Sequence, residues 1–248
     1  MLFSIITVTY NAAQTLPYTL TSVAQQTFRD FEHIVIDGAS TDSTVELIRD
    51  AASHSPNMRY VSEPDKGIYD AMNKGMMLAK GQYLIFLNAG DSFHKPDTLA
   101  RVAQAIAEND TPGIVYGQTQ IVDSDRKRIG DRHLTAPEVL TYRSFASGMV
   151  VCHQAFVALA RIAPLYNLKY RFSADYDWCI QCLQHSRKNA YLPNILIDYL
   201  NEGVTTANFK SSLKERYRIM CHYYGTIPTT LRHLGFLVRH ICRKVKKH

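Results

Sequence analysis

Side chains that could bind a ligand gather at the ends of several apolar segments. The run 83–87 leads into Asn88-Ala89-Gly90-Asp91, which offers an amide, two small residues and a carboxylate. The run 33–36 ends at Asp37, and the run 3–8 ends at Thr9-Tyr10-Asn11. Carboxylate and amide oxygens are hard ligands that favour Mg²⁺ or Mn²⁺, which proteins hold by one or two side chains together with substrate phosphates. The pattern therefore predicts a site for a divalent cation and a phosphorylated ligand.

Further acids extend this set: Asp42 and Asp65 in the loops and Asp175 in the second half of the chain. Together with Asp37 and Asp91 they predict an acidic cleft, which would repel a diphosphate unless a divalent cation came between them. Neither a GxxxxGK[ST] loop nor a GxGxxG loop follows the first apolar run, so the usual modes of ATP hydrolysis and dinucleotide binding are not indicated. A metal-bridged nucleotide diphosphate fits this pattern best.

A parallel sheet would bring these residues to one edge. Apolar, β-branched runs predict strands at 3–8, 33–36, 58–61, 83–87 and 114–116. Helical periodicity between them predicts helices with apolar faces near 16–24, 45–48, 68–79 and 99–106. Ser43-Thr44-Val45-Glu46 matches a capping box, and Gly81 is the expected C-cap of the third helix. Alternating strands and helices predict an α/β fold with right-handed crossovers, and ligands bind such sheets at the carboxyl ends of the strands.

The second half of the chain is less regular. Residues 118–143 are polar and predict a hairpin and loops that border the cleft. Asp175 is expected at the N-cap of a helix, where it could cap the helix or face the cleft, whereas Asp177 is expected to complement the helix dipole. The pair Cys179 and Cys182 lies on the same helix and predicts core packing rather than a zinc site, because no second pair accompanies it.

Composition describes an ordinary globular chain. The 248 residues are 46% hydrophobic and 20% charged, which suits one large domain or one domain with an appendage. Five cysteines in no framework spacing indicate a reducing compartment. Because neither a signal peptide nor a bilayer-spanning run is recognisable, we expect a cytoplasmic protein.

The net charge of +6 is concentrated in the C-terminal tail, which has ten Lys or Arg and one acid from Phe209 onward. Apolar residues recur there at spacings of three and four, at Leu231, Leu234, Val238, Ile241 and Val245. This pattern is typical of a basic amphipathic helix in a membrane interface beside anionic lipid. The alternative is that the apolar stripe packs against the protein's own body or a partner.

Four motifs in order resemble those of the family 2 glycosyltransferases, which have the GT-A fold. They are Ile6-Thr7-Val8-Thr9-Tyr10-Asn11, Ile36-Asp37-Gly38-Ala39-Ser40-Thr41-Asp42, the segment Pro64–Gly75 (PDKGIYDAMNKG) and Leu87-Asn88-Ala89-Gly90-Asp91. The likeness covers roughly residues 3–206 and is strongest to bacterial enzymes of capsule, exopolysaccharide, colanic-acid and O-antigen assembly. It implies a Rossmann-like, mostly parallel sheet flanked by helices, with a C-terminal helical extension.

The resemblance also implies roles for single residues. Thr9, Tyr10, Asp37 and Asp65 would hold the base and ribose of a nucleotide sugar, with Asn73 near the nucleotide or sugar. Asn11, Gly38, Ser40, Asp42, Lys66 and Asn88 complete the donor-binding set. Asp91 stands in the family's D-x-D metal motif, in which Asn88 and Gly90 replace acids. Asp175 matches the catalytic base, although Ala174 replaces the preceding glutamate of the family's E-D motif.

The acceptor side is implied by weaker similarities. His153 and Gln154 lie in a C-H-Q segment and would touch donor or acceptor, although a single histidine is more often structural. Gly203-Val204-Thr205-Thr206 would line the acceptor side or form only a turn. Residues 1–208 would form the catalytic domain, with 1–117 as its nucleotide-sugar half and 118–208 as its acceptor half, and 209–248 would form basic amphipathic helices.

The expected activity is inverting transfer of a sugar from a nucleotide-diphosphate sugar, with UDP the first choice, to an acceptor hydroxyl. A lipid-linked glycan or oligosaccharide acceptor would explain a tail at the inner face of the cytoplasmic membrane. Two other classes remain open: a nucleotidyltransferase, although the Gly-rich basic loop after the first strand is missing, and a non-catalytic subunit that binds nucleotide sugar or lipid. Nucleic-acid binding is not expected, because the basic tail contains no recognisable module.

Overall fold

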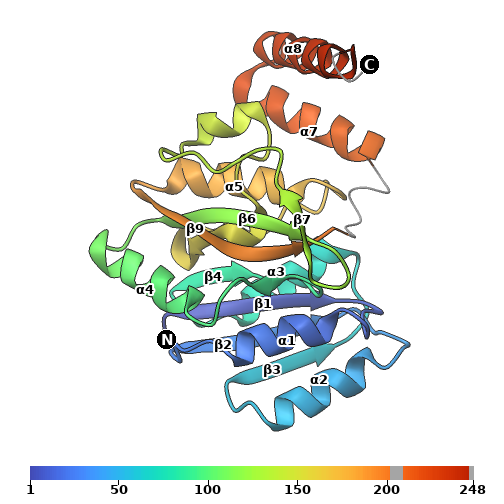
Figure 1. The fold of residues 1–248 in the computed structure, drawn as a ribbon, viewed down its shortest axis with the longest axis vertical. Helices are drawn as coiled ribbons and strands as arrows, with labels where there is room; N and C mark the ends of the chain where they lie inside the picture. Colours follow the sequence, from blue (N-terminus) through green and yellow to red (C-terminus); the bar gives the residue numbers. More distant parts are fainter. Residues whose placement is uncertain (202–208, 246–248) are drawn as a thin grey trace.

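One mixed sheet organises the protein in a computed structural model that describes residues 1–201 and 209–245, without the side chains of 209 and 236–245. The described residues form nine strands, in the order β3-β2-β1-β4-β8-β6-β9-β5, with β7 paired to β6 (Figure 1). The strands are β1 (Phe3–Thr9), β2 (Phe31–Asp37), β3 (Met58–Ser62), β4 (Tyr83–Phe86), β5 (Ser92–Phe93), β6 (Ile114–Val122), β7 (Arg128–Asp131), β8 (Phe156–Leu159) and β9 (Asn189–Leu200).

The first four strands of this order are parallel, as the β-α alternation predicted. Thr9 pairs with Asp37, and Asp37 pairs with Ser62, so the carboxyl ends of β1, β2 and β3 are level. Beyond β4 the sheet becomes mixed, because β8 runs antiparallel to both β4 and β6. The predicted hairpin is confirmed by the antiparallel pairing of β6 with β7.

Helices cover both faces of the sheet. They are α1 (Leu16–Ala24), α2 (Thr44–Ser53), α3 (Ile68–Leu78), α4 (Thr98–Glu108), α5 (Ala174–His185), α7 (Phe209–Tyr224) and α8 (Thr226–Val245). Because side chains alternate along a strand, Ile6 packs with α3 and α5 whereas Ile5 packs with α1 and α4. Gly75 lets α3 lie close to β1, since a Cβ atom there would be 2.4 Å from Ile6 Cγ2. An α/β fold with helices on both faces of the sheet is the architecture that the sequence predicted, and the antiparallel strands beyond β4 are the addition.

Two local predictions were wrong. Helix α3 ends at Ala79 in extended backbone, and Gly81 instead passes against β1, where a Cβ atom would lie 2.4 Å from the Ser4 nitrogen. Ser43 occupies the N-cap of α2 without a side-chain capping bond. Asp42 Oδ1 accepts the Thr44 N–H at 3.1 Å in its place.

Helices α7 and α8 lie at the end of the molecule opposite α2 and β3 (Figure 1). Three apolar residues of α8, spaced four and three positions apart, are exposed: Ile227 by 75%, Leu231 by 64% and Leu234 by 54%. Over its described side chains, the predicted stripe therefore does not pack on the body. Among the described residues, no helix is both long and apolar enough to cross a membrane.

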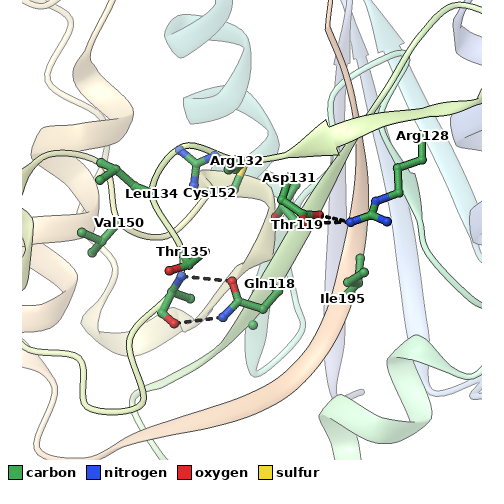
Figure 2. Close-up of a pocket in the computed structure, with 12 residues that line it drawn as sticks. Gln118, Thr119, Arg128, Asp131, Arg132, Leu134, Thr135, Val150, Cys152 and Ile195 are labelled. Carbon is green, nitrogen blue, oxygen red and sulfur yellow. Dashed lines mark hydrogen bonds and ion pairs between the residues drawn. The ribbon is translucent and has the colours of Figure 1, made fainter. Parts of the chain in front are cut away.

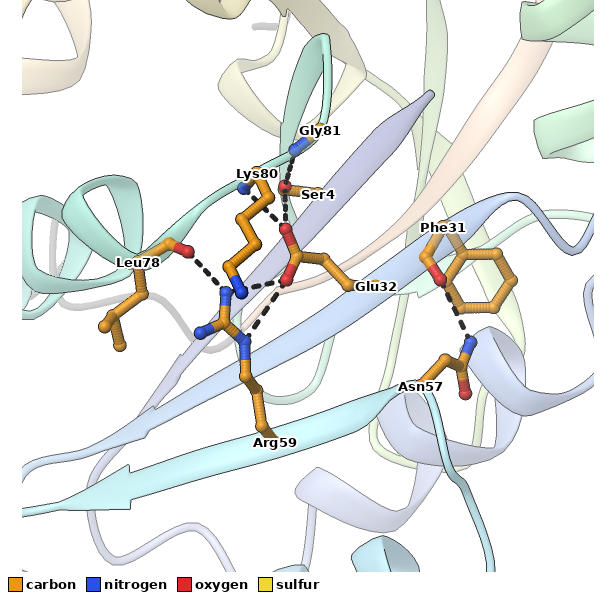
Figure 3. A network of polar contacts seen from close by, with 8 residues as sticks. All are labelled: Ser4, Phe31, Glu32, Asn57, Arg59, Leu78, Lys80 and Gly81. Carbon is orange, nitrogen blue, oxygen red and sulfur yellow. Dashed lines mark hydrogen bonds and ion pairs between the residues drawn. The ribbon is translucent and has the colours of Figure 1, made fainter. Parts of the chain in front are cut away.

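A buried carboxylate joins the amino ends of three parallel strands, on the side opposite the loops analysed below (Figure 3). Glu32 Oε1 accepts hydrogen bonds from Ser4 Oγ at 2.7 Å and the Lys80 N–H at 2.6 Å, and Arg59 Nη2 lies 2.6 Å from Oε2. Arg59 also donates to the Leu78 carbonyl at the end of α3. The network thus ties β1, β2, β3 and α3 together.

We expect Glu32→Gln to lower the free energy of unfolding by about 2 kcal/mol at pH 7, since hydrogen bonds to a charged group are lost. These bonds outweigh burial and hold the pKa of Glu32 below its usual value. The stabilisation of the fold by the Glu32 carboxylate is therefore fully present at pH values above the usual pKa of glutamate. It is lost as the pH falls through the folded-state pKa of Glu32. Urea unfolding at pH 7 and pH 3.5 measures this loss of stability. Lys127→Gln, which removes an exposed ion pair with Asp125, is the control and should leave the stability nearly unchanged.

Candidate active site

A cleft of about 950 Å³ lies at the carboxyl ends of β1 and β4. The structure brings eight of the predicted site residues to its wall: Thr9, Tyr10, Asp65, Asn88, Asp91, His153, Gln154 and Asp175. They come from the ends of β1 and β4, the loop before α3, the short turn His153–Ala155 and the first turn of α5. Segments more than 160 residues apart in the chain thus line one cavity.

At one end of the cleft the loops after β1 and β2 meet the loop before α3. A Cβ atom at Gly38 would lie 2.5 Å from Asp65 Oδ2 and 3.4 Å from Tyr10 Cδ2, so a larger residue would displace the Asp65 carboxylate from this position. Asp65 Oδ1 accepts the Gly67 N–H at 2.8 Å. The Tyr10 ring is 62% exposed and offers an aromatic face beside a fixed carboxylate.

Asp37 holds these loops in place through hydrogen bonds and is not among the residues that line the cleft. Its buried carboxylate accepts hydrogen bonds from the backbone and hydroxyl of Ser40 and from Ser62 Oγ at 2.6 Å. Asn11 joins the same loops, because its N–H donates to Ser40 Oγ and its Oδ1 accepts the Thr41 N–H, both at 2.8 Å.

Three more predicted donor-binding residues also lie outside the cleft lining. Asp42 accepts N–H groups from Ala13 and Thr44. Lys66 is exposed. The Asn73 amide forms two hydrogen bonds with the backbone of Tyr166, at 3.0 and 2.7 Å. The structure therefore gives Asp42 and Asn73 positioning contacts within the protein.

Asp91 is buried at the end of β4, and both of its oxygens accept hydrogen bonds, from Gln154 Nε2 at 2.8 Å and the Leu200 N–H at 3.0 Å. Burial raises the pKa of Asp91 to about 7, against the opposing effects of these bonds and of Arg126. Gly90 beside it has φ +98°, and a Cβ atom there would lie 2.8 Å from Leu200 Cδ2. The glycine in the altered D-x-D motif is thus required by the backbone.

The residues at this position fit a divalent cation only in part. Among the described residues, no three His, Cys, Asp or Glu side chains cluster as a metal site. Asn88 Oδ1 is buried without a hydrogen-bond partner among the described residues, as is Thr9 Oγ1, and both residues line the cleft. One carboxylate and one free amide oxygen suit a cation that takes its other ligands from substrate phosphates and water.

Asp175 lies in the first turn of α5, and its Oδ1 accepts a hydrogen bond from Tyr69 Oη at 3.0 Å. Ser173, not Asp175, is the N-cap residue, so the structure places Asp175 in the cleft without a capping role. Asp177 is buried and bonds Gln181 and Tyr223 Oη at 2.8 Å each, so it connects α5 to α7 besides lying near the helix dipole.

Aromatic rings pack around His153, which lines the cleft. His153 stacks on Phe86 with ring centroids 4.9 Å apart, and Tyr166 stacks on Trp178 at 5.2 Å. His153 Nε2 forms a short hydrogen bond with Tyr166 Oη. Because burial lowers the pKa of His153 to about 4, its imidazole is neutral at neutral pH.

The expectation of an acidic cleft is wrong. Among the described residues, Asp65, Asp91 and Asp175 contribute the carboxylates of its lining, and Arg132, Arg171 and Arg216 line it as well. Arg132 follows β7, in the segment 118–143 that was predicted to border the cleft. Arg171 precedes α5 and Arg216 lies on α7, where no sequence pattern indicated them. The cleft can therefore attract a phosphate group through its own cations.

A side cavity of about 250 Å³ adjoins the cleft, since Arg132 and Cys152 line both (Figure 2). Gln118 fixes its wall through two hydrogen bonds to the backbone of Ala136. Away from both cavities, Cys179 and Cys182 are buried free thiols in the core, as the prediction of core packing required.

Sequence reasoning missed Tyr69 and Tyr166 as well as Arg171 and Arg216. Tyr69 lies within the motif Pro64–Gly75, and its place in the first turn of α3 was the one available signal. Tyr166 carries no local signal, because its role arises from contacts with Asn73 and His153. The Gly203–Thr206 segment lies outside the described residues.

Comparisons with known proteins agree with this geometry. Residues 4–163 match the family model "Glycosyl transferase family 2". A "PGL/p-HBAD biosynthesis glycosyltransferase" of Mycobacterium bovis is 38% identical over 215 residues, which cover 84% of this chain and 77% of that protein. An uncharacterised glycosyltransferase of Mycobacterium tuberculosis is 34% identical over 186 residues, which cover 72% of this chain and 67% of that protein.

Solved structures share the fold at lower identity. S. aureus TarS residues 1–349 with UDP-GlcNAc gives a TM-score of 0.72 at 18% identity, covering 98% of this chain and 73% of that one. The mannosyltransferase PcManGT of Pyrobaculum calidifontis, in complex with GDP-Man and Mn²⁺, gives 0.63 at 16% identity, covering 95% and 75%. The chain therefore belongs to glycosyl transferase family 2, and it is a glycosyltransferase with the GT-A fold.

Proposed function

We propose that the enzyme transfers a sugar from a nucleotide-diphosphate sugar to an acceptor hydroxyl with inversion at the anomeric carbon, and that Asp175 is the general base. The observation that carries this proposal is that Asp175 lines the same cavity as Tyr10, Asp65, Asn88 and Asp91. The Tyr10, Gly38 and Asp65 loops would hold the nucleoside, and the end of β4 would lie near the diphosphate.

In this mechanism the acceptor oxygen attacks the anomeric carbon from the face opposite the leaving group. Asp175 takes the hydroxyl proton as the new carbon–oxygen bond forms, and the bond to the diphosphate breaks with its electron pair. Tyr69 holds the carboxylate in place through its hydrogen bond to Oδ1. The second Asp175 oxygen is then available to the acceptor.

The donor class is supported by relatives of the fold. TarS structures contain UDP or UDP-GlcNAc, and the PcManGT complex contains GDP-Man. We take a UDP-sugar as the first donor to test. Asp91, with Asn88 beside it, would hold Mn²⁺ or Mg²⁺, and the bound cation would supply Lewis-acid stabilisation of the leaving diphosphate.

We further propose a lipid-linked or oligosaccharide acceptor presented at an anionic membrane surface. The exposed residues Ile227, Leu231 and Leu234 form an apolar face on α8, within a tail that carries ten cations. Such a helix binds in the interface through buried apolar area and attraction to anionic lipid. This placement would bring the cleft near acceptors that are anchored in the bilayer.

Asp175→Asn should lower the turnover number by about 10³-fold, because the general base is removed, while the dissociation constant for UDP stays unchanged. Release of UDP from a panel of UDP-sugars, with membrane extract as acceptor, measures turnover, and calorimetry measures UDP binding. The melting temperature serves as the control for folding. Turnover near that of the wild type would refute the base assignment.

Asp91→Asn should remove any gain in UDP affinity that Mn²⁺ provides. Because the pKa of Asp91 is raised to about 7 and a metal ligand must be deprotonated, the gain in the wild type should be larger at pH 8 than at pH 6. Calorimetric titration with and without Mn²⁺ at both pH values tests this. An unchanged Mn²⁺ effect in the variant would show that the cation binds elsewhere.

Truncation after Tyr224 should abolish co-sedimentation with vesicles that contain anionic phosphatidylglycerol, because it removes the apolar face and most of the basic tail. The full chain should lose binding in high salt and on neutral vesicles. Leu231→Ser/Leu234→Ser in the full chain tests the apolar face without deleting the helix. Unchanged sedimentation of both variants would exclude this helix as the membrane contact.

A further inference from the structure

We propose that α7 is a component of the active site and that Arg216 on this helix binds a phosphate group beside Asp175. The inference rests on the proposed function and extends it by assigning a phosphate subsite to a helix outside the matched segment 4–163. The phosphate would belong either to the donor diphosphate or to a phosphate-bearing lipid acceptor.

Helix α7 is attached to the peptide that leads into Asp175. The Glu215 carboxylate accepts the Arg171 N–H at 2.9 Å and the Phe172 N–H at 2.8 Å. Ser173 Oγ lies 3.0 Å from Ser212 Oγ. These bonds fix α7 against the start of α5 within four residues of the Asp175 carboxylate.

The hydrogen bonds of Glu215 hold α7 beside this peptide, and the next residue, Arg216, lines the cleft. Arg216 is half-buried, and its Nε has no hydrogen-bond partner among the described residues. No described carboxylate lies within ion-pair distance of its guanidinium group. A buried N–H donor without a partner is unfavourable, so a ligand that supplies an anionic acceptor would be favoured there.

Phosphate is the anion that suits this position. Guanidinium groups bind phosphate through two parallel hydrogen bonds, and Arg171 supplies a second cation in the same lining. Asp175 carries the nearby negative charge, so the arginines would offset its repulsion of a phosphorylated substrate. Burial and Asp175 raise the pKa of Tyr69, and the positive charge of Arg216 acts against this rise.

The test compares Arg216→Ala and Arg216→Lys with Lys214→Ala, which removes one exposed cation from the same helix. Calorimetry in EDTA measures binding of UDP, uridine and the soluble isoprenoid citronellyl phosphate, so that any cation at Asp91 makes no contribution. We expect about tenfold weaker binding of at least one phosphate ligand to Arg216→Ala, which corresponds to about 1.4 kcal/mol. Arg216→Lys should lose less, while uridine binding and the Lys214→Ala control should stay unchanged.

The two arms identify the source of the phosphate. Weakened UDP binding assigns Arg216 to the donor, and weakened citronellyl phosphate binding assigns it to the acceptor. Wild-type affinity of Arg216→Ala for both ligands overturns the proposal, provided that circular dichroism shows a folded variant. If the wild type binds the phosphate ligands through Arg216 but Asp175→Asn transfers sugar normally, the base assignment fails and the phosphate subsite stands.

Discussion

The buried carboxylate of Asp37 is the interaction on which the arrangement of the cleft depends. Its level pairing with Thr9 and Ser62 brings three strands to an end together, and its oxygens hold the loop after β2 through Ser40. A buried carboxylate needs such bonds, because leaving it unpaired would be costly. The loop after β1 is joined to the same turn, so Tyr10 and Asp65 face each other over Gly38. The geometry of the Tyr10 and Asp65 end of the cleft thus follows from a residue that lies outside its described lining.

The rest of the cleft is positioned by contacts between distant segments. Asn73 holds the Tyr166 backbone, Tyr166 bonds His153, and Gln154 next in the chain bonds Asp91. Near Asp175, Glu215 of α7 has the same function, because it accepts hydrogen bonds from the backbone N–H groups of Arg171 and Phe172. Polar groups that are satisfied in this way limit the freedom of the reacting side chains, and such preorganisation lowers the cost of reaching the transition state.

The balance of charge in the cleft bears on the proposed diphosphate donor. Among the described residues, three guanidinium groups and three carboxylates line the cleft, and burial raises the pKa of one of those carboxylates, Asp91, to about 7. The altered D-x-D motif keeps one acid, Asp91. This is consistent with a site in which arginine side chains and a metal ion would together offset the charge of the phosphate groups. Arg216 would make α7 part of this site. The amphipathic helix α8 directly follows α7 in the chain.

Local sequence determined the parallel half of the fold and the residues at its strand ends, because period, turn residues and strand length are properties of neighbouring positions. It also indicated the hairpin at 118–143 and the exposed apolar face of α8. Only the tertiary structure decided that Asp37 and Asn73 support the site from outside the cleft lining, that Gly81 is a packing residue, and that β8 and β9 complete a mixed sheet. That Arg171 and Arg216 line the same cleft as Asp91 and Asp175 could not be predicted either, since contacts between residues tens of positions apart depend on how the helices dock and leave no periodic pattern in the chain.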